Sequence, residues 1–231
     1  FKKAIEYFDK AKKFYTQDDY KKESYITFLG IISFSYANIG EYEKATECLK
    51  ELKKLIEIRE NPYSKMVGTH YTILTLAHMG HIEDFEEKEL DTIIEKIEAS
   101  DNLLLKYSLY FSVGYFLYKK NKIKKATEYI ETSIKIAENL NIGAGILAPY
   151  LVLSEIAVKN KKDEIINKNF KNIIKKIKKV KDRFSYQWFL RLKALYLSYS
   201  INQTKSKKAI ILINKAIKES RKLGNKPELA R

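Results

Sequence analysis

The sequence predicts an all-α fold, a right-handed α–α superhelix built from antiparallel helical hairpins. Three observations predict it. A similar pair of helices recurs about every 40 residues, and a fixed period in this range is typical of stacked repeats. Only three Pro and eight Gly occur in 231 residues, which favours helix. The stretches between them are rich in Leu, Ile, Lys, Glu and Tyr, and hydrophobic residues make up 45% of the chain, enough to build a core.

Each repeat has an aromatic and Leu-rich first helix, a short turn with Gly or Asn, and a second helix with a small or apolar anchor residue. We expect one solenoid over residues 1–231, with both ends cut from a longer protein. The anchors align at Ala4, Ala45, Phe85, Ala126, Ile166 and Ala209. The expected units are a half-repeat 1–18, hairpins 20–59, 63–99, 103–140, 144–181 and 184–223, and the start of a further repeat at 226–231.

The first units follow the pattern well. Residues 1–18 match a lone second helix. In the next unit Leu29, Ile32 and Tyr36 fall on one helical stripe. Gly40 ends that helix, because glycine takes the left-handed C-cap conformation without strain. Ala45 is small because the two helices approach closely there.

The later units vary the pattern. The third keeps Gly80 at its turn but has Phe85 where a small residue is expected, which predicts wider helix spacing. The fourth has Asn121 at its turn. The fifth has an apolar anchor in its second helix and lysines along the outer face of that helix. The sixth has a longer turn, at 202–206.

The segment Gly-Glu-Tyr-x-x-Ala at 40–45 and its flanking helices resemble a tetratricopeptide repeat, and residues 109–140 resemble a second copy. The period exceeds the usual 34 residues. In this it is similar to the longer-helix variants of bacterial and archaeal signalling ATPases, transcription regulators and peptide-quorum sensors. The resemblance implies a non-catalytic protein- or peptide-binding scaffold or sensor within a larger cytoplasmic regulatory protein. A peptide-pheromone sensor and a structural adaptor are alternatives.

The resemblance also implies a concave groove lined by outward positions of the first helices. Aromatic side chains there suit an apolar or helical peptide segment. The same side chains serve equally well as packing between repeats, so both roles stay open. The groove residues are Phe34, Asn38, His70, Phe111, Tyr115, Tyr118 and Glu155.

No catalytic or cofactor-binding motif is found. The three histidines, His70, His78 and His81, lack the spacing of a metal site, so we expect no metal and no cofactor. A single cysteine, Cys48, excludes an internal disulfide framework and fits a reducing cytoplasm. No apolar run is long enough to span a bilayer.

The formal net charge of +15 is carried mostly by lysine. Such a charge suits an acidic protein partner or, as an alternative, RNA bound by a helical repeat. Lysine use set by genome composition explains it as well. The most basic surface is the outer face of the helix around 170–181, formed by Lys171, Lys175, Lys176, Lys178 and Lys179.

Overall fold

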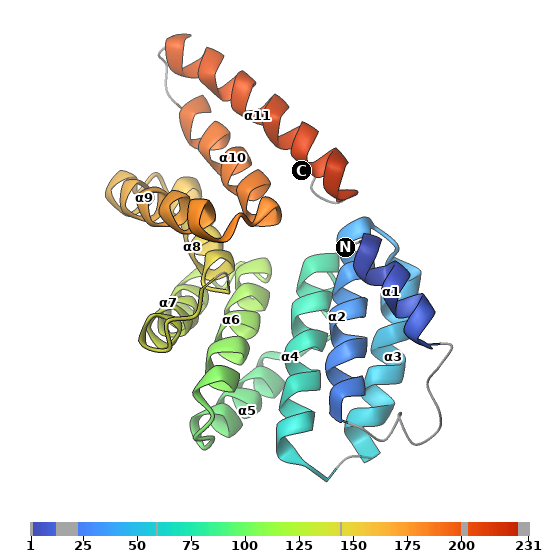
Figure 1. The fold of residues 1–231 in the computed structure, drawn as a ribbon. Helices are drawn as coiled ribbons and strands as arrows, with labels where there is room; N and C mark the ends of the chain where they lie inside the picture. Colours follow the sequence, from blue (N-terminus) through green and yellow to red (C-terminus); the bar gives the residue numbers. More distant parts are fainter. Residues whose placement is uncertain (1, 13–22, 59, 144, 200–202, 226–231) are drawn as a thin grey trace. The chain divides into compact units, whose positions relative to one another are not determined.

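A computed structural model describes residues 2–12, 23–58, 60–143, 145–199 and 203–225 (Figure 1). Within these ranges the chain forms eleven α-helices and no β-strand, so the predicted all-α fold is confirmed. The helices are α1 (Lys2–Lys12), α2 (Glu23–Ile39), α3 (Tyr42–Ile58), α4 (Pro62–Met79), α5 (Glu87–Glu98), α6 (Leu103–Lys119), α7 (Ile123–Asn139), α8 (Leu147–Lys159), α9 (Asp163–Val180), α10 (Arg183–Ser198) and α11 (Gln203–Leu223).

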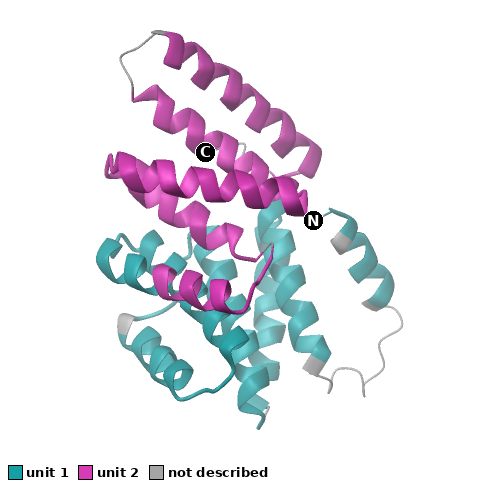
Figure 2. Cartoon of the chain, turned by 60° about the vertical axis from the view of Figure 1, so that its left-hand side comes forward, with its two compact units in different colours: residues 1–129 teal, residues 130–231 magenta. Residues whose placement is uncertain are grey.

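The chain divides into two compact units, residues 1–129 and residues 130–231, and the division falls within α7 (Figure 2). In the first unit α2, α4 and α6 pack side by side, while α3 packs against α2 and α4. In the second unit α8 packs against α9 and α10, and α10 packs against α11. Consecutive helices therefore pack in neighbouring pairs, which is the arrangement of a helical repeat.

The turns within the hairpins recur at the predicted period. Gly40, Gly80, Asn121 and Lys161 have positive φ angles of 76°, 86°, 61° and 54°, and they follow one another at steps of 40, 41 and 40 residues. After each of them, the next backbone N–H donates to the carbonyl five residues earlier, at 2.9–3.0 Å. This is the Schellman C-cap, which satisfies helix-end carbonyls and reverses the chain. The repeat is thus visible in the backbone itself.

First and second helices differ in how they are buried. In α6 every side chain from Leu109 to Tyr118 is buried, since neighbours cover several of its faces. The second helix α9 buries only one stripe, which includes Ile173 and Ile177. Four of the six aligned anchors lie buried on second helices: Ala45, Ala126, Ile166 and Ala209.

Two predicted details are wrong. Phe85 does not anchor a helix, because α5 begins only at Glu87 and Phe85 lies in the connection before it. The Glu89 carboxylate accepts the backbone N–H of Glu86 at 2.8 Å, and this capping box sets the late start of α5. The long turn predicted at 202–206 is wrong from Gln203 onward, where α11 begins. The further repeat predicted at 226–231 lies outside the described residues, as does the side chain of the Ala4 anchor.

Candidate functional site

The groove residues of the first unit lie on α2, α4 and α6. Phe34 of α2 meets His78 of α4 edge to face, with ring centroids 5.4 Å apart. Asn38 is buried, and its side-chain amide donates to the Phe34 carbonyl at 2.8 Å. On α6 Phe111 stacks on Tyr115 at 6.1 Å.

The groove aromatics of α6 are well buried. Phe111 is 8% exposed, Tyr115 3% and Tyr118 6%. The Lys119 ammonium lies 5.2 Å from the Tyr115 ring centroid and 5.9 Å from that of Tyr118. These rings therefore offer little of their faces to a ligand in this structure.

Glu155, the groove residue of the second unit, forms a buried polar cluster. Its Oε2 accepts from Trp188 Nε1 and Arg191 Nη2, both at 3.3 Å. The Glu155 and Arg191 side chains are 11% and 12% exposed, so the ion pair is largely shielded from water. The Lys159 ammonium lies 3.8 Å from Glu155 Oε1.

His70 differs from the other groove residues because it lines a small hollow of about 150 Å³ between α4 and α6. Its ring meets Tyr71 edge to face at 4.8 Å. Burial lowers the pKa of His70 to about 4, so its imidazole is neutral at physiological pH. Among the described residues, no group of three or more His, Cys, Asp or Glu side chains lies close enough together to hold a metal ion.

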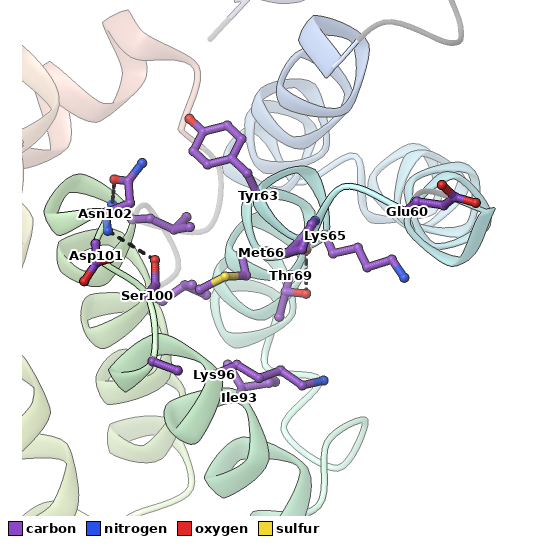
Figure 3. A pocket seen from close by; sticks show the side chains of 14 residues that line it. Glu60, Tyr63, Lys65, Met66, Thr69, Ile93, Lys96, Ser100, Asp101 and Asn102 are labelled. Carbon is purple, nitrogen blue, oxygen red and sulfur yellow. Dashed lines mark hydrogen bonds between the residues drawn. The ribbon is translucent and has the colours of Figure 1, made fainter.

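A larger hollow of the first unit lies elsewhere, between α4, α5 and α6 (Figure 3). Its volume is about 700 Å³. Sequence reasoning did not identify its residues. Its apolar lining comes from all three helices and includes Met66, Ile93, Leu105 and Leu109. Figure 3 shows Met66 and Thr69 on α4, with Ile93 and Lys96 on α5 beside them.

Several polar groups of this hollow are already bonded within their own segments. The Asn102 side chain accepts the Leu105 N–H at 3.0 Å and so caps α6. The Ser100 hydroxyl accepts the Asn102 N–H at 3.2 Å, and the Thr69 hydroxyl donates to the Lys65 carbonyl at 2.8 Å. These contacts leave the apolar lining as the main feature available to a ligand.

A second hollow of about 590 Å³ adjoins the first. Both are lined by Thr69 of α4 and Ile93 of α5, so the two hollows meet in the gap between these helices. The second one extends to α3, where Leu49 and Ile56 contribute apolar surface. Together they form what we call the α4–α5 cleft.

The cleft exists because the connection before α5 is held by α6. Phe85 meets Phe116 of α6 edge to face, at 5.8 Å and 84°. The Lys120 ammonium donates to the Phe85 carbonyl and lies 5.5 Å from the Phe116 ring centroid. α5 accordingly packs against α6. The large residue at position 85 was the one sequence signal of this wider spacing.

The lysines of the predicted basic face lie on α9. Lys171, Lys175, Lys178 and Lys179 are exposed, and Lys176 is half-buried. Ile166, Asn169, Ile173 and Ile177 are buried on the opposite side of the helix. The structure thus places four of the five predicted lysines on the exposed face of α9, and Lys176 lies toward its buried side.

No protein-family model, no curated protein and no solved structure matches this chain. Within the described ranges, no helix is long and apolar enough to cross a membrane.

Proposed function

We propose that this chain is a non-catalytic binding module for a protein or peptide, and that the α4–α5 cleft is its binding site. The observation that carries the proposal is the pair of adjoining hollows, of about 700 and 590 Å³, lined by apolar side chains from four helices. An apolar cleft of this kind accepts the large side chains along one face of an amphipathic segment.

The chemistry of the cleft supports binding rather than catalysis. A catalytic pocket needs polar groups that converge on one reacting atom. Here Thr69, Ser100 and Asn102 are already bonded to backbone groups of their own segments. The charged groups Glu60, Lys65, Lys96 and Asp101 line the hollow together with the apolar residues, as in a polar rim around an apolar centre.

The cellular setting belongs to the same proposal. The resemblance to tetratricopeptide repeats favours a scaffold or sensor role inside a larger regulatory protein. The chain has a single cysteine, Cys48, which is buried, and such sparse use of cysteine fits a reducing compartment such as the cytoplasm.

The test is selection of displayed random peptides on the full chain, followed by affinity measurement on two variants. Ile93→Asp places a carboxylate in both hollows, so it should abolish binding of apolar peptides because burying an unpaired charge is costly. The matched control is Ile58→Asp, since Ile58 is 75% exposed at the end of α3 and lines neither hollow.

We expect the selected peptides to share apolar residues at helical spacing and to bind the Ile58→Asp variant normally. Selection of no apolar motif, or equal binding to both variants, would refute the proposal. Circular dichroism of both variants establishes that each one is folded.

A further inference from the structure

The net positive charge of this protein lies in its second unit. Residues 130–231 contain 23 Lys and Arg against 8 Asp and Glu, a formal charge of +15. Residues 1–129 contain 21 of each sign and are neutral. The two units carry similar numbers of basic residues, so the difference is a depletion of acids. Lysine use set by genome composition would add basic residues to both units, and it does not explain why acidic residues are scarce in the second unit alone.

Three of the eight acidic residues in the second unit have internal roles. Glu155 pairs with Arg191, and Glu219 pairs with Arg183 at 2.7 Å. The Asp182 carboxylate caps α10 by accepting the backbone N–H of Phe184 at 2.9 Å. These three acids serve α10 and its contacts with α8 and α11. On α9 itself the acids Asp163 and Glu164 stand in the first turn, and the helix has no acid from there to Val180.

The outer face of α9 carries a row of lysines that is long enough to follow an extended ligand. Lys168, Lys171, Lys175, Lys178 and Lys179 follow one side of the helix over about 16 Å at 1.5 Å per residue. In the described part of the chain none of them forms an ion pair. Like charges three or four residues apart repel one another, so an anionic ligand on this row relieves a standing repulsion.

A hollow of about 340 Å³ lies at the C-terminal end of this row. Ile174 and Ile177 contribute its apolar surface, and Lys178 and Lys181 contribute charge. On the α10 side it is lined by Tyr186, whose ring lies 5.3 Å from the Lys215 ammonium. Asp182 and Arg183 also line it, and these two are engaged in the cap of α10 and the pair with Glu219. The hollow thus offers room for an apolar side chain in a lining with more cations than acids.

We infer that the basic face of α9 and this hollow together bind an acidic segment of another protein that carries an apolar anchor residue. Carboxylates of the segment pair with the lysine row, and the anchor enters the hollow beside Ile174 and Ile177. This surface lies entirely within the second unit, so the inference is independent of the function proposed for the α4–α5 cleft.

The surface suits an acidic protein segment better than a nucleic acid. Single-stranded nucleic acids gain affinity by stacking bases on aromatic rings. The aromatic residue of α9, Phe170, packs instead edge to face against Phe189 at 5.2 Å and Tyr196 at 6.0 Å. Arginine is the usual bidentate partner of phosphate, and Arg183 and Arg191 are already paired with glutamates.

The test measures binding of labelled peptides to the full chain by fluorescence anisotropy. The first probe is a glutamate-rich peptide with leucines at helical spacing. A second peptide replaces its leucines by serine, a third replaces its glutamates by glutamine, and an oligouridine RNA is the fourth probe. The variant is Lys171→Gln/Lys175→Gln/Lys179→Gln. The matched control, Lys207→Gln/Lys208→Gln/Lys218→Gln, removes the same charge from exposed positions of α11.

We expect the first peptide to bind best, and the α9 variant to weaken it about ten-fold, since three exposed ion pairs together account for a change of this size. The α11 control should bind nearly as the wild type does, and serine in place of leucine should weaken the peptide. Three results would overturn the inference: equal losses in both triple variants, no effect of the leucines, or tighter binding of the RNA. Failure of every probe to bind would overturn it as well.

Discussion

The close approach of α2 to α4 makes a sharp prediction for Gly30→Ala. A Cβ atom at Gly30 would lie 2.7 Å from the Tyr71 Cβ and would also collide with the ring atoms Cγ and Cδ2. Favourable carbon–carbon contacts lie at about 3.5–4.0 Å. Because the clash includes the Cβ of Tyr71, rotation of the ring does not relieve it, and the two helices must move apart.

The expected magnitude follows from two opposing terms. Replacing glycine by alanine within a helix gains about 1 kcal/mol of helix propensity. Overpacking costs about 1–3 kcal/mol, and a clash with a Cβ belongs at the upper end of that range. We therefore expect Gly30→Ala to lower the free energy of unfolding by about 2 kcal/mol, which lowers the Tm by about 4–8 °C for a chain of this size.

Gly68→Ala is the matched control, measured by urea and thermal unfolding with circular dichroism. Its new methyl group would meet Ile56 Cγ1 at 2.6 Å and Cδ1, the outer part of a flexible side chain that can rotate away. The propensity gain of about 1 kcal/mol then offsets most of the cost. In a Tyr71→Gly background, which removes this Cβ together with the ring, Gly30→Ala should lose most of its effect. Equal stability of the two glycine variants would show that α2 and α4 do not approach this closely.

Three further predictions concern single side chains. Burial lowers the pKa of His70 to about 4 from 6.5, so the neutral form is favoured by folding, and stability falls as pH drops below about 6.5. We expect a loss of about 2 kcal/mol between about pH 7 and pH 5 in urea titrations, and no such loss in His70→Gln. Glu155→Gln leaves the Arg191 charge shielded without its carboxylate and should cost about 3 kcal/mol, whereas Glu155→Leu/Arg191→Leu should unfold nearly as the wild type does. Emission of Trp188, the single tryptophan, reports the same site, and unchanged emission in Glu155→Leu/Arg191→Leu, which removes the acceptor, would contradict the contact. Asp182→Ala removes the cap of α10 and should cost about 1 kcal/mol in thermal unfolding; no change would show that the cap is dispensable.

The fold was predictable because its signals are local. Gly40, Gly80 and Asn121 mark turns where the backbone needs a positive φ, and the structure has one at each. Small or apolar anchors such as Ala45 and Ala126 mark the buried sides of second helices. Lys161 shows the limit of such signals. It adopts the left-handed conformation in the corresponding turn, but a lysine, unlike Gly or Asn, does not indicate a positive φ in the sequence.

The candidate site was less predictable because a hollow depends on where packing is missing. Met66, Leu105 and Leu109 read as ordinary core positions, and nothing in their spacing shows that α5 lies away from α4. Whether the groove expected from the family resemblance is open also depends on how neighbouring side chains pack. Tyr115 and Tyr118 face a direction that a repeat pattern identifies, but the pattern does not say how much of each ring is covered. The unequal net charge of the two units is a property of the sequence, but it can be counted only once the structure gives the boundary between residues 129 and 130.

A single departure from the repeat pattern accounts for the geometry of the cleft. A small anchor at position 85 would let the second helix start near it and pack against α4, as Ala45 does in the preceding hairpin. Phe85 is too large for that contact, and its ring instead meets Phe116. Lys120 then binds the Phe85 carbonyl, and the capping box at Glu86 starts α5 beside α6. The residue that breaks the repeat thus moves a helix toward its next neighbour, and the space left behind is the apolar surface that we propose as the binding site.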